Sequence, residues 1–306
     1  MSNARLKSSF IYLANAVNDL RGNWATLTLA LAPLVVIAAL CLLPDALNIE
    51  HGLATRFEPG VRNVVYSAAY LPAQTPYAPE AQETVAPLFP GWMLHVFHAV
   101  FFLLTYVVNL VVLCAIRRFQ AGVQRPRVLN EAIGIYRESL SLAPAFFWVA
   151  ILQLLATVIG FVLLIIPGLI AIIWLYFSQY ALVFDGLHSV PALFHSRDLM
   201  RRRFFKVAVR VLVFFAVWSG YNSWVGGAFF VFSLLIGPIG ALTGTLSFAV
   251  FLLDLAASAV GFATSAFFIA AGVRLYQDLS QIAVAEAAVN GAVVLPPTAP
   301  LPGIAG

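Results

Sequence analysis

Long stretches of apolar residues alternate with short polar segments along the whole chain. An α-helix that crosses a bilayer needs about 20 mostly apolar residues, and six stretches approach or exceed that length. They are 24–43, 92–116, 143–166, 167–184, 211–236 and 246–273. The first follows a polar segment, 1–23, and lacks a clean cleavage pattern, so we expect a span rather than a signal peptide. The pattern therefore predicts six transmembrane helices.

One apolar run is too long for a single crossing. A helix over 143–184 would be about 60 Å long, which is about twice the hydrocarbon thickness of a bilayer. Pro167 and Gly168 interrupt this run, and this pair of residues favours a chain reversal. We therefore expect a tight helical hairpin that turns at Pro167 and Gly168.

A short amphipathic segment precedes the first, third and fifth spans. These segments are 1–23, 128–142 and 189–206. In the first, apolar residues recur every three or four positions from Leu6 to Leu20, which places them on one helical face. Basic residues on the other face are typical of helices that lie in the membrane interface. The predicted fold is an all-α, polytopic membrane protein with three parallel repeats of interfacial helix plus helical hairpin.

The composition excludes the soluble classes of protein. Hydrophobic residues make up 62% of the chain and charged residues 10%, whereas soluble domains contain about 45–50% and about 25%. The two cysteines, Cys41 and Cys114, both lie in apolar runs. The sequence therefore predicts neither a disulfide framework nor a clustered zinc site.

The distribution of basic residues predicts the orientation in the membrane. All but two of the 17 lysines and arginines flank the same ends of the predicted spans. The exceptions, Arg56 and Arg62, lie in the loop 44–91 among five acidic residues. The positive-inside rule then places both termini in the cytoplasm. The loop 44–91 would then be extracytoplasmic, as a cap over the outer face or, alternatively, as a ligand-gathering lid. The tail 279–306 would be cytoplasmic, and we expect it to be disordered.

Three short segments resemble a known family. They are IIPGLI at 165–170, YALVFDG at 180–186 and ALFHSRDL at 192–199. The chain resembles the membrane domain attached to some bacterial glycerophosphodiester phosphodiesterases, and the related stand-alone six-span membrane proteins of unknown function. This resemblance implies a six-span fold in the bacterial inner membrane. The catalytic barrel of the phosphodiesterases has no counterpart in this sequence, so the resemblance implies no activity.

A few polar residues fall inside the predicted spans. Asp254 lies in span six, where a charge is costly unless it meets a partner or water. It either fixes helix packing, which is the simpler interpretation, or belongs to an ion or proton path. We expect three intramembrane amides to form hydrogen bonds between helices. These are Asn109, Gln153 and Gln179.

Two other groups of residues are candidates for binding. His95 and His98 are three positions apart at the end of span two, but such a pair makes only a weak metal site, and we expect no metal. A basic cluster near the third amphipathic segment either reflects topology alone or binds anionic lipid headgroups. It consists of Arg197, Arg201, Arg202, Arg203 and Lys206.

These patterns predict a non-enzymatic protein that interacts with membrane lipids, or with a membrane-protein partner, in membrane organisation or envelope homeostasis. The alternative is a transporter or channel for a small solute, ion or lipid that uses Asp254. We find no nucleophile with a base, no phosphate-binding loop and no paired carboxylates, and thus expect neither an enzyme nor a cofactor. Nucleic-acid binding is not supported, and the oligomeric state is left open.

Overall fold

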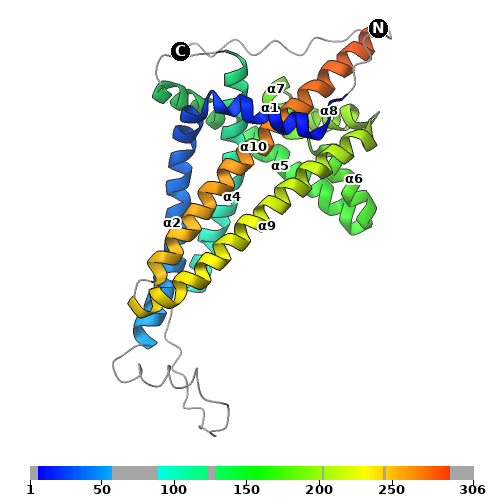
Figure 1. The fold of residues 1–306 in the computed structure, drawn as a ribbon. Helices are drawn as coiled ribbons and strands as arrows, with labels where there is room; N and C mark the ends of the chain where they lie inside the picture. Colours follow the sequence, from blue (N-terminus) through cyan, green and yellow to red (C-terminus); the bar gives the residue numbers. More distant parts are fainter. Residues whose placement is uncertain (1–5, 57–88, 123–127, 202, 244–245, 290–306) are drawn as a thin grey trace. The chain divides into compact units, whose positions relative to one another are not determined.

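The computed structural model describes residues 6–56, 89–122, 128–201, 203–243 and 246–289, and these residues form helices joined by turns (Figure 1). Within them, six segments are long and apolar enough to cross a membrane. The prediction of an all-α protein with six membrane-spanning helices is therefore confirmed. The helices are α1 Ser9–Arg21, α2 Trp24–Arg56, α4 Gly91–Gln120, α5 Val128–Leu163, α6 Ile165–Leu175, α7 Ser178–Asp185, α8 Val190–Arg201, α9 Phe204–Thr243 and α10 Leu246–Val289.

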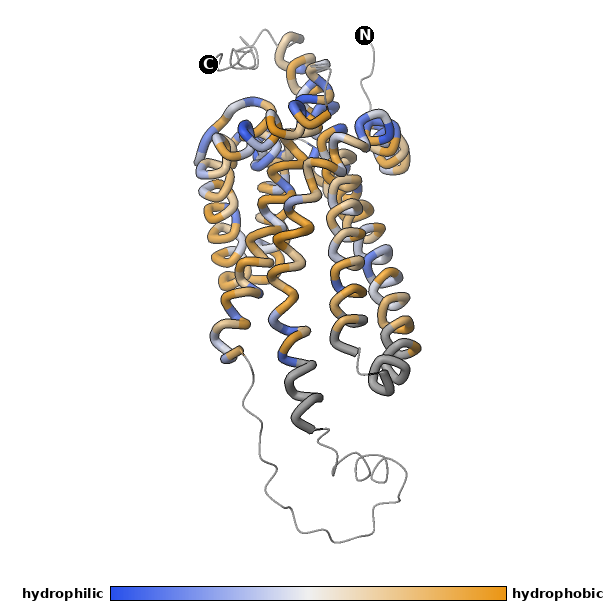
Figure 2. The backbone as a smooth tube through the Cα atoms, turned by 90° about the vertical axis from the view of Figure 1, so that its left-hand side faces the viewer, coloured by the Kyte–Doolittle hydropathy of each residue, from blue (hydrophilic) through white to orange (hydrophobic). Residues whose placement is uncertain are grey.

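The chain divides into two compact units. Unit 1 comprises residues 1–34, 105–224 and 260–306, and unit 2 comprises residues 35–104 and 225–259. In unit 1, the short helices α1 and α8 lie near the ends of the long ones (Figure 1). Hydrophilic residues of this unit gather at that same end, whereas its helical spans are mostly hydrophobic, with a few hydrophilic positions among them (Figure 2).

Three predicted boundaries differ from the structure. The amphipathic segment 128–142 is not a separate helix, because α5 runs from it into the span without a break and includes Pro144. Helix α2 continues to Arg56, past the predicted start of the loop at 44, and residues 57–88 lie outside the described part of the chain. The predicted tail 279–306 is helical as far as Val289, and its remainder is also outside the described residues.

These differences share a physical cause. Segments at the ends of spans are rich in alanine, leucine and other residues that favour helix. A helix that has already formed extends at little cost, and the proline and glycine residues in these segments do not stop it, since α2 continues through Pro44 and Gly52 and α5 through Pro144. Hydrophobicity marks the part of a helix that can enter the membrane, and it does not mark where the helix ends.

The hairpin between the third and fourth spans turns at Leu164, three residues before the predicted position. Leu164 has an extended backbone, with φ −168° and ψ 154°, and α6 begins directly after it. Pro167 therefore lies in the first turn of α6, where its missing N–H leaves no intrahelical hydrogen bond unmade. Gly168 serves a different purpose, because it allows the two helices to come close together.

Two glycines face each other across this hairpin. A methyl group on Gly160 would lie 2.9 Å from the Cα of Gly168 and 3.2 Å from the carbonyl oxygen of Pro167. Both of these neighbours are backbone atoms, which cannot move aside as a flexible side chain would. The close approach of α5 and α6 therefore requires glycine at position 160.

We expect Gly160→Ala to destabilise unit 1 by about 1–3 kcal/mol, the usual cost of overpacking. Thermal unfolding in a mild detergent, followed by circular dichroism, measures this change. Gly220→Ala is the matched control, because a methyl group on Gly220 meets no atom within 4 Å, and alanine favours helix over glycine. Equal melting temperatures for the two variants would contradict the proposed close contact.

Candidate functional site

Helix α1 is held against the C-terminal part of α10 by ionic and hydrogen-bonding contacts. The Tyr12 hydroxyl donates a hydrogen bond to the Asp278 carboxylate at 2.8 Å, and Lys7 Nζ lies 3.8 Å from the same carboxylate. Arg274 donates from Nε to Asp19 at 2.6 Å, and a second bond from the same guanidinium makes the contact bidentate. The apolar face of α1 is buried through Tyr12, Leu13, Ala16 and Leu20.

Burial raises the pKa of Tyr12 well above its ordinary value, and the hydrogen bond to Asp278 and the charge of that carboxylate raise it further. The neutral phenol is the form that can donate to Asp278. The side chain is only 1% exposed, so a phenolate there would be poorly solvated and would be repelled by the carboxylate.

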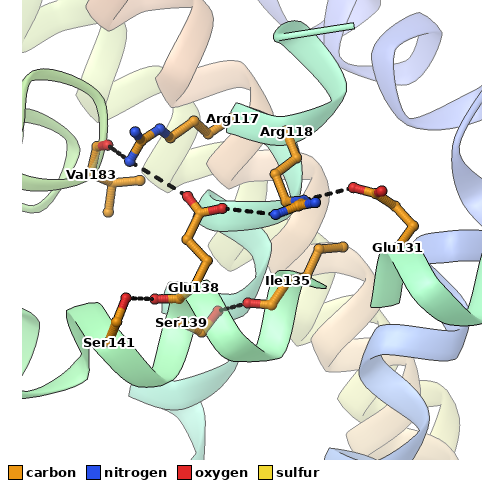
Figure 3. A network of polar contacts seen from close by, with 8 residues as sticks. All are labelled: Arg117, Arg118, Glu131, Ile135, Glu138, Ser139, Ser141 and Val183. Carbon is orange, nitrogen blue, oxygen red and sulfur yellow. Dashed lines mark hydrogen bonds and ion pairs between the residues drawn. The ribbon is translucent and has the colours of Figure 1, made fainter. Parts of the chain in front are cut away.

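A second group of charges joins the end of α4 to the first turns of α5. Arg118 Nε lies 2.6 Å from Glu131, and its Nη1 lies 3.3 Å from Glu138. Arg117 reaches Glu138 at 3.5 Å and donates to the carbonyl oxygen of Val183 at 2.8 Å. Figure 3 shows Glu138 between the two arginines. The Arg118 and Glu131 side chains are only 15% and 8% exposed, so the loss of either partner would leave a buried charge uncompensated.

Ser196 on α8 supplies hydrogen-bond partners to the backbone at the break between α6 and α7. At this break, the N–H of Phe177 does not bond to a carbonyl of the preceding turn but donates to Ser196 Oγ at 3.1 Å. Ser196 Oγ in turn donates to the carbonyl oxygen of Trp174 at 2.6 Å. Ser196 and Phe177 are both fully buried. One hydroxyl thus satisfies one donor and one acceptor that the break leaves without helical partners.

The basic cluster predicted to bind lipid headgroups is divided in the structure. Arg197 lies over the ring of Trp174, 5.3 Å from its centroid, and Arg203 forms an ion pair with Glu286 on α10. Arg201 and Lys206 are exposed. The fifth member, Arg202, lies outside the described residues.

Sequence reasoning did not identify the acidic partners of these cations. Glu131 and Glu138 are seven residues apart, which places them on the same helical face, opposite the Arg-Arg pair that ends the preceding span. That spacing was the available signal. Asp19, Asp278 and Glu286 gave no comparable signal, because their cationic partners, Arg274, Lys7 and Arg203, lie 255, 271 and 83 residues away in the chain.

In unit 2, the predicted polar residues lie at the ends of the spans and on their outer faces. His98 Nε2 forms an ion-pair contact of 3.0 Å with Asp45, and His95 is exposed. Asp254 is exposed on α10, where the charge of Asp45 acts on it. Among the described residues, no group of three or more histidine, cysteine or acidic side chains could hold a metal ion.

The three intramembrane amides have different surroundings. Gln153 on α5 and Ser178 on α7 lie within hydrogen-bond distance, with 3.2 Å between Oε1 and Oγ. Ser178 Oγ also lies 2.7 Å from the carbonyl oxygen of Leu175. Because a hydroxyl has only one proton to donate, Gln153 and Leu175 compete for the same hydrogen bond, and the contact to Leu175 is the shorter one. Asn109 and Gln179 are half-buried.

Two clefts of unit 1 are lined by residues that the structure describes. The first has a volume of 730 Å³ and lies between α1, the start of α2, α9 and α10. Its walls are formed by apolar side chains, with Arg21 and Trp24 at the junction of α1 and α2. The second, of 400 Å³, lies between α8 and the last turns of α10, and both acidic and basic side chains line it.

Comparison of the chain with protein-family models, with curated proteins and with solved structures gives no match. The resemblance to the membrane domain of glycerophosphodiester phosphodiesterases therefore stays a prediction. It is based on the three short segments quoted above.

We expect Ser196→Ala to destabilise unit 1 by about 1–3 kcal/mol, because it leaves a buried N–H and a buried carbonyl unpaired. Thermal unfolding in detergent measures this loss. Ser141→Ala is the control, since Ser141 is exposed and its hydroxyl donates to a carbonyl oxygen three residues before it. This variant should change the free energy of unfolding by no more than about 0.5 kcal/mol. Similar melting temperatures for the two variants would show that the break in the span does not depend on Ser196.

Tyr12→Phe should weaken the docking of α1 by about 1.5–3 kcal/mol, the range for a hydrogen bond to a charged group. The raised pKa of Tyr12 means that this contribution is complete below the ordinary value of 10.0 and is lost as the pH rises above it. The difference in melting temperature between wild type and variant should therefore narrow at high pH. Tyr221→Phe changes an exposed tyrosine, and this variant should have the same melting temperature as wild type at every pH tested. A difference that widens above pH 10.0 would contradict the assignment.

Proposed function

We propose that this protein is a non-enzymatic integral protein of the bacterial inner membrane that binds anionic lipids at its cytoplasmic face. The six spans identify a multi-pass membrane protein. The distribution of lysine and arginine along the sequence supports cytoplasmic termini. The proposed role is in membrane organisation or envelope homeostasis, through lipids or a membrane-protein partner.

The observation that carries this proposal is the combination of exposed aromatic and cationic side chains on α8 and the start of α9. Phe194 is 54% exposed and Phe205 is 82% exposed. Phe194 and Arg201 are seven residues apart on α8, which places them on one face, and Phe205 precedes Lys206. An apolar residue that can enter the acyl region, beside a cation that can meet a phosphate, is typical of an interfacial helix.

Internal pairing leaves few cations to contact lipid. The guanidinium groups of Arg118, Arg203 and Arg274 are already bound to carboxylates. Arg201 and Lys206 are exposed instead. We therefore assign headgroup binding to these two residues rather than to the whole basic cluster.

The alternative is a transporter or channel that uses Asp254. Asp254 is exposed, and the hydrogen bond found there joins its backbone carbonyl oxygen to the hydroxyl of Ser258. Asp45 carries the same charge as Asp254 and pairs with His98. Neither of the two clefts described above is lined by Asp254. The exposed Phe205 and Lys206 at the start of α9 are a positive observation for lipid binding, and we therefore prefer that function.

Analysis of the lipids that co-purify with the protein in a mild detergent tests the proposal. We expect anionic lipids to be enriched over their share of the host membrane. The double variant R201E/K206E should reduce that enrichment by about 30-fold, because each basic residue near the surface contributes about 1 kcal/mol and the two together contribute about 2 kcal/mol. The charge-preserving double variant R201K/K206R is the control and should retain the enrichment. Equal lipid profiles for both double variants would contradict the proposal.

A further inference from the structure

The larger cleft of unit 1 has walls that offer almost no polar atoms. Val17 on α1, Val217 on α9, and Ala263 and Phe267 on α10 form its apolar surface. Thr264 also lines it, but its hydroxyl donates to the carbonyl oxygen of Val260 at 2.8 Å and so requires no further acceptor. Water in such a cleft would find few partners, which favours an apolar occupant.

One end of the cleft is charged. Arg21 ends α1 and is exposed, and it is the sole charged side chain among the described residues that line the cleft. Trp24, which begins α2, lies at the same place. Tryptophan at the start of a span is typical of the boundary between headgroups and acyl chains. The cation therefore stands at the level where a lipid phosphate would lie.

The length of the cleft along α10 matches one leaflet of a bilayer. Its lining on this helix extends from Val260 to Phe268, which is about 12 Å at the helical rise. Half of a hydrocarbon core is about 15 Å thick. An acyl chain from a lipid of the nearer leaflet would therefore fit along these residues. The volume of 730 Å³ lies within the range of about 300–1,000 Å³ found for ligand-binding pockets.

We propose that this cleft binds one anionic glycerophospholipid, with an acyl chain between α9 and α10 and its phosphate at Arg21. The proposal rests on the proposed function and gives it a specific site. The binding differs from the contact made by Arg201 and Lys206, because it involves a single lipid held by a built cleft. Apolar walls determine the affinity for the chain, and Arg21 determines the preference for a negative headgroup.

Native mass spectrometry of the detergent-purified protein tests this site, with phosphatidylglycerol and phosphatidylcholine of identical chains as probes. Wild type should bind one phosphatidylglycerol about fivefold more tightly than one phosphatidylcholine, the difference expected from one cation near the headgroup. Ala263→Trp, which fills the cleft, should abolish this complex. Arg21→Gln should keep binding but remove the preference. Ala256→Trp places the same residue on α10 outside the cleft lining and should behave as wild type.

A second measurement uses wild type and so does not depend on the folding of a variant. Phosphatidylglycerol with a photoreactive acyl chain should label residues 217–221 and 260–268, and unlabelled phosphatidylglycerol should displace it. Labelling spread evenly over the exposed spans, or labelling that is not displaced, would overturn the proposal. A dimer that Ala263→Trp dissociates would identify a second copy as the occupant and would also overturn it.

The two proposals can fail separately. If Ala263→Trp binds lipid as wild type does while R201E/K206E loses its anionic lipids, the cleft proposal is wrong and the proposed function stands. If wild type shows no preference for anionic lipid in either experiment, both are wrong.

Discussion

The fold depends on the requirement that backbone N–H and C=O groups inside a membrane find partners within the protein. Continuous helices meet this requirement by themselves, and long apolar helices account for most of the described chain. The fourth span does not form one continuous helix. It is interrupted at Tyr176 and Phe177, between the end of α6 and the start of α7. There Ser196 supplies both an acceptor and a donor from a neighbouring helix. The position of α8 is thereby coupled to the integrity of the span.

Charge pairing follows the same principle at the polar end of unit 1. Arg118 would be costly to bury alone, and it meets a carboxylate at 2.6 Å. Arg274 is more exposed and also meets a carboxylate at 2.6 Å. These pairs link segments distant in sequence, as between α1 and α10. The basic residues therefore serve two purposes. They supply the charge asymmetry on which orientation depends, and several of them also hold the helices of unit 1 together.

The difference between paired and exposed basic residues affects how lipid binding is inferred. A cation that is paired with a carboxylate has little charge left to attract a phosphate, so the number of arginines near a membrane overstates the capacity to bind lipid. Arg21, Arg201 and Lys206 remain exposed, and both proposals are built on them. The docking of α1 through Tyr12 and Asp19 also positions Arg21 at the larger cleft.

The sequence by itself determined the class of the protein and the approximate positions of its six spans, because apolar runs of about 20 residues have few other stable environments. It also indicated the hairpin between the third and fourth spans, although the turn lies at Leu164 rather than at Pro167 and Gly168. The threefold repeat stays a prediction. Only the tertiary structure decided which arginines are paired, how Ser196 repairs a broken helix and where the cleft lies. Those features depend on contacts between residues as far apart as Tyr12 and Asp278, and local hydrophobic patterns carry no information about such pairs.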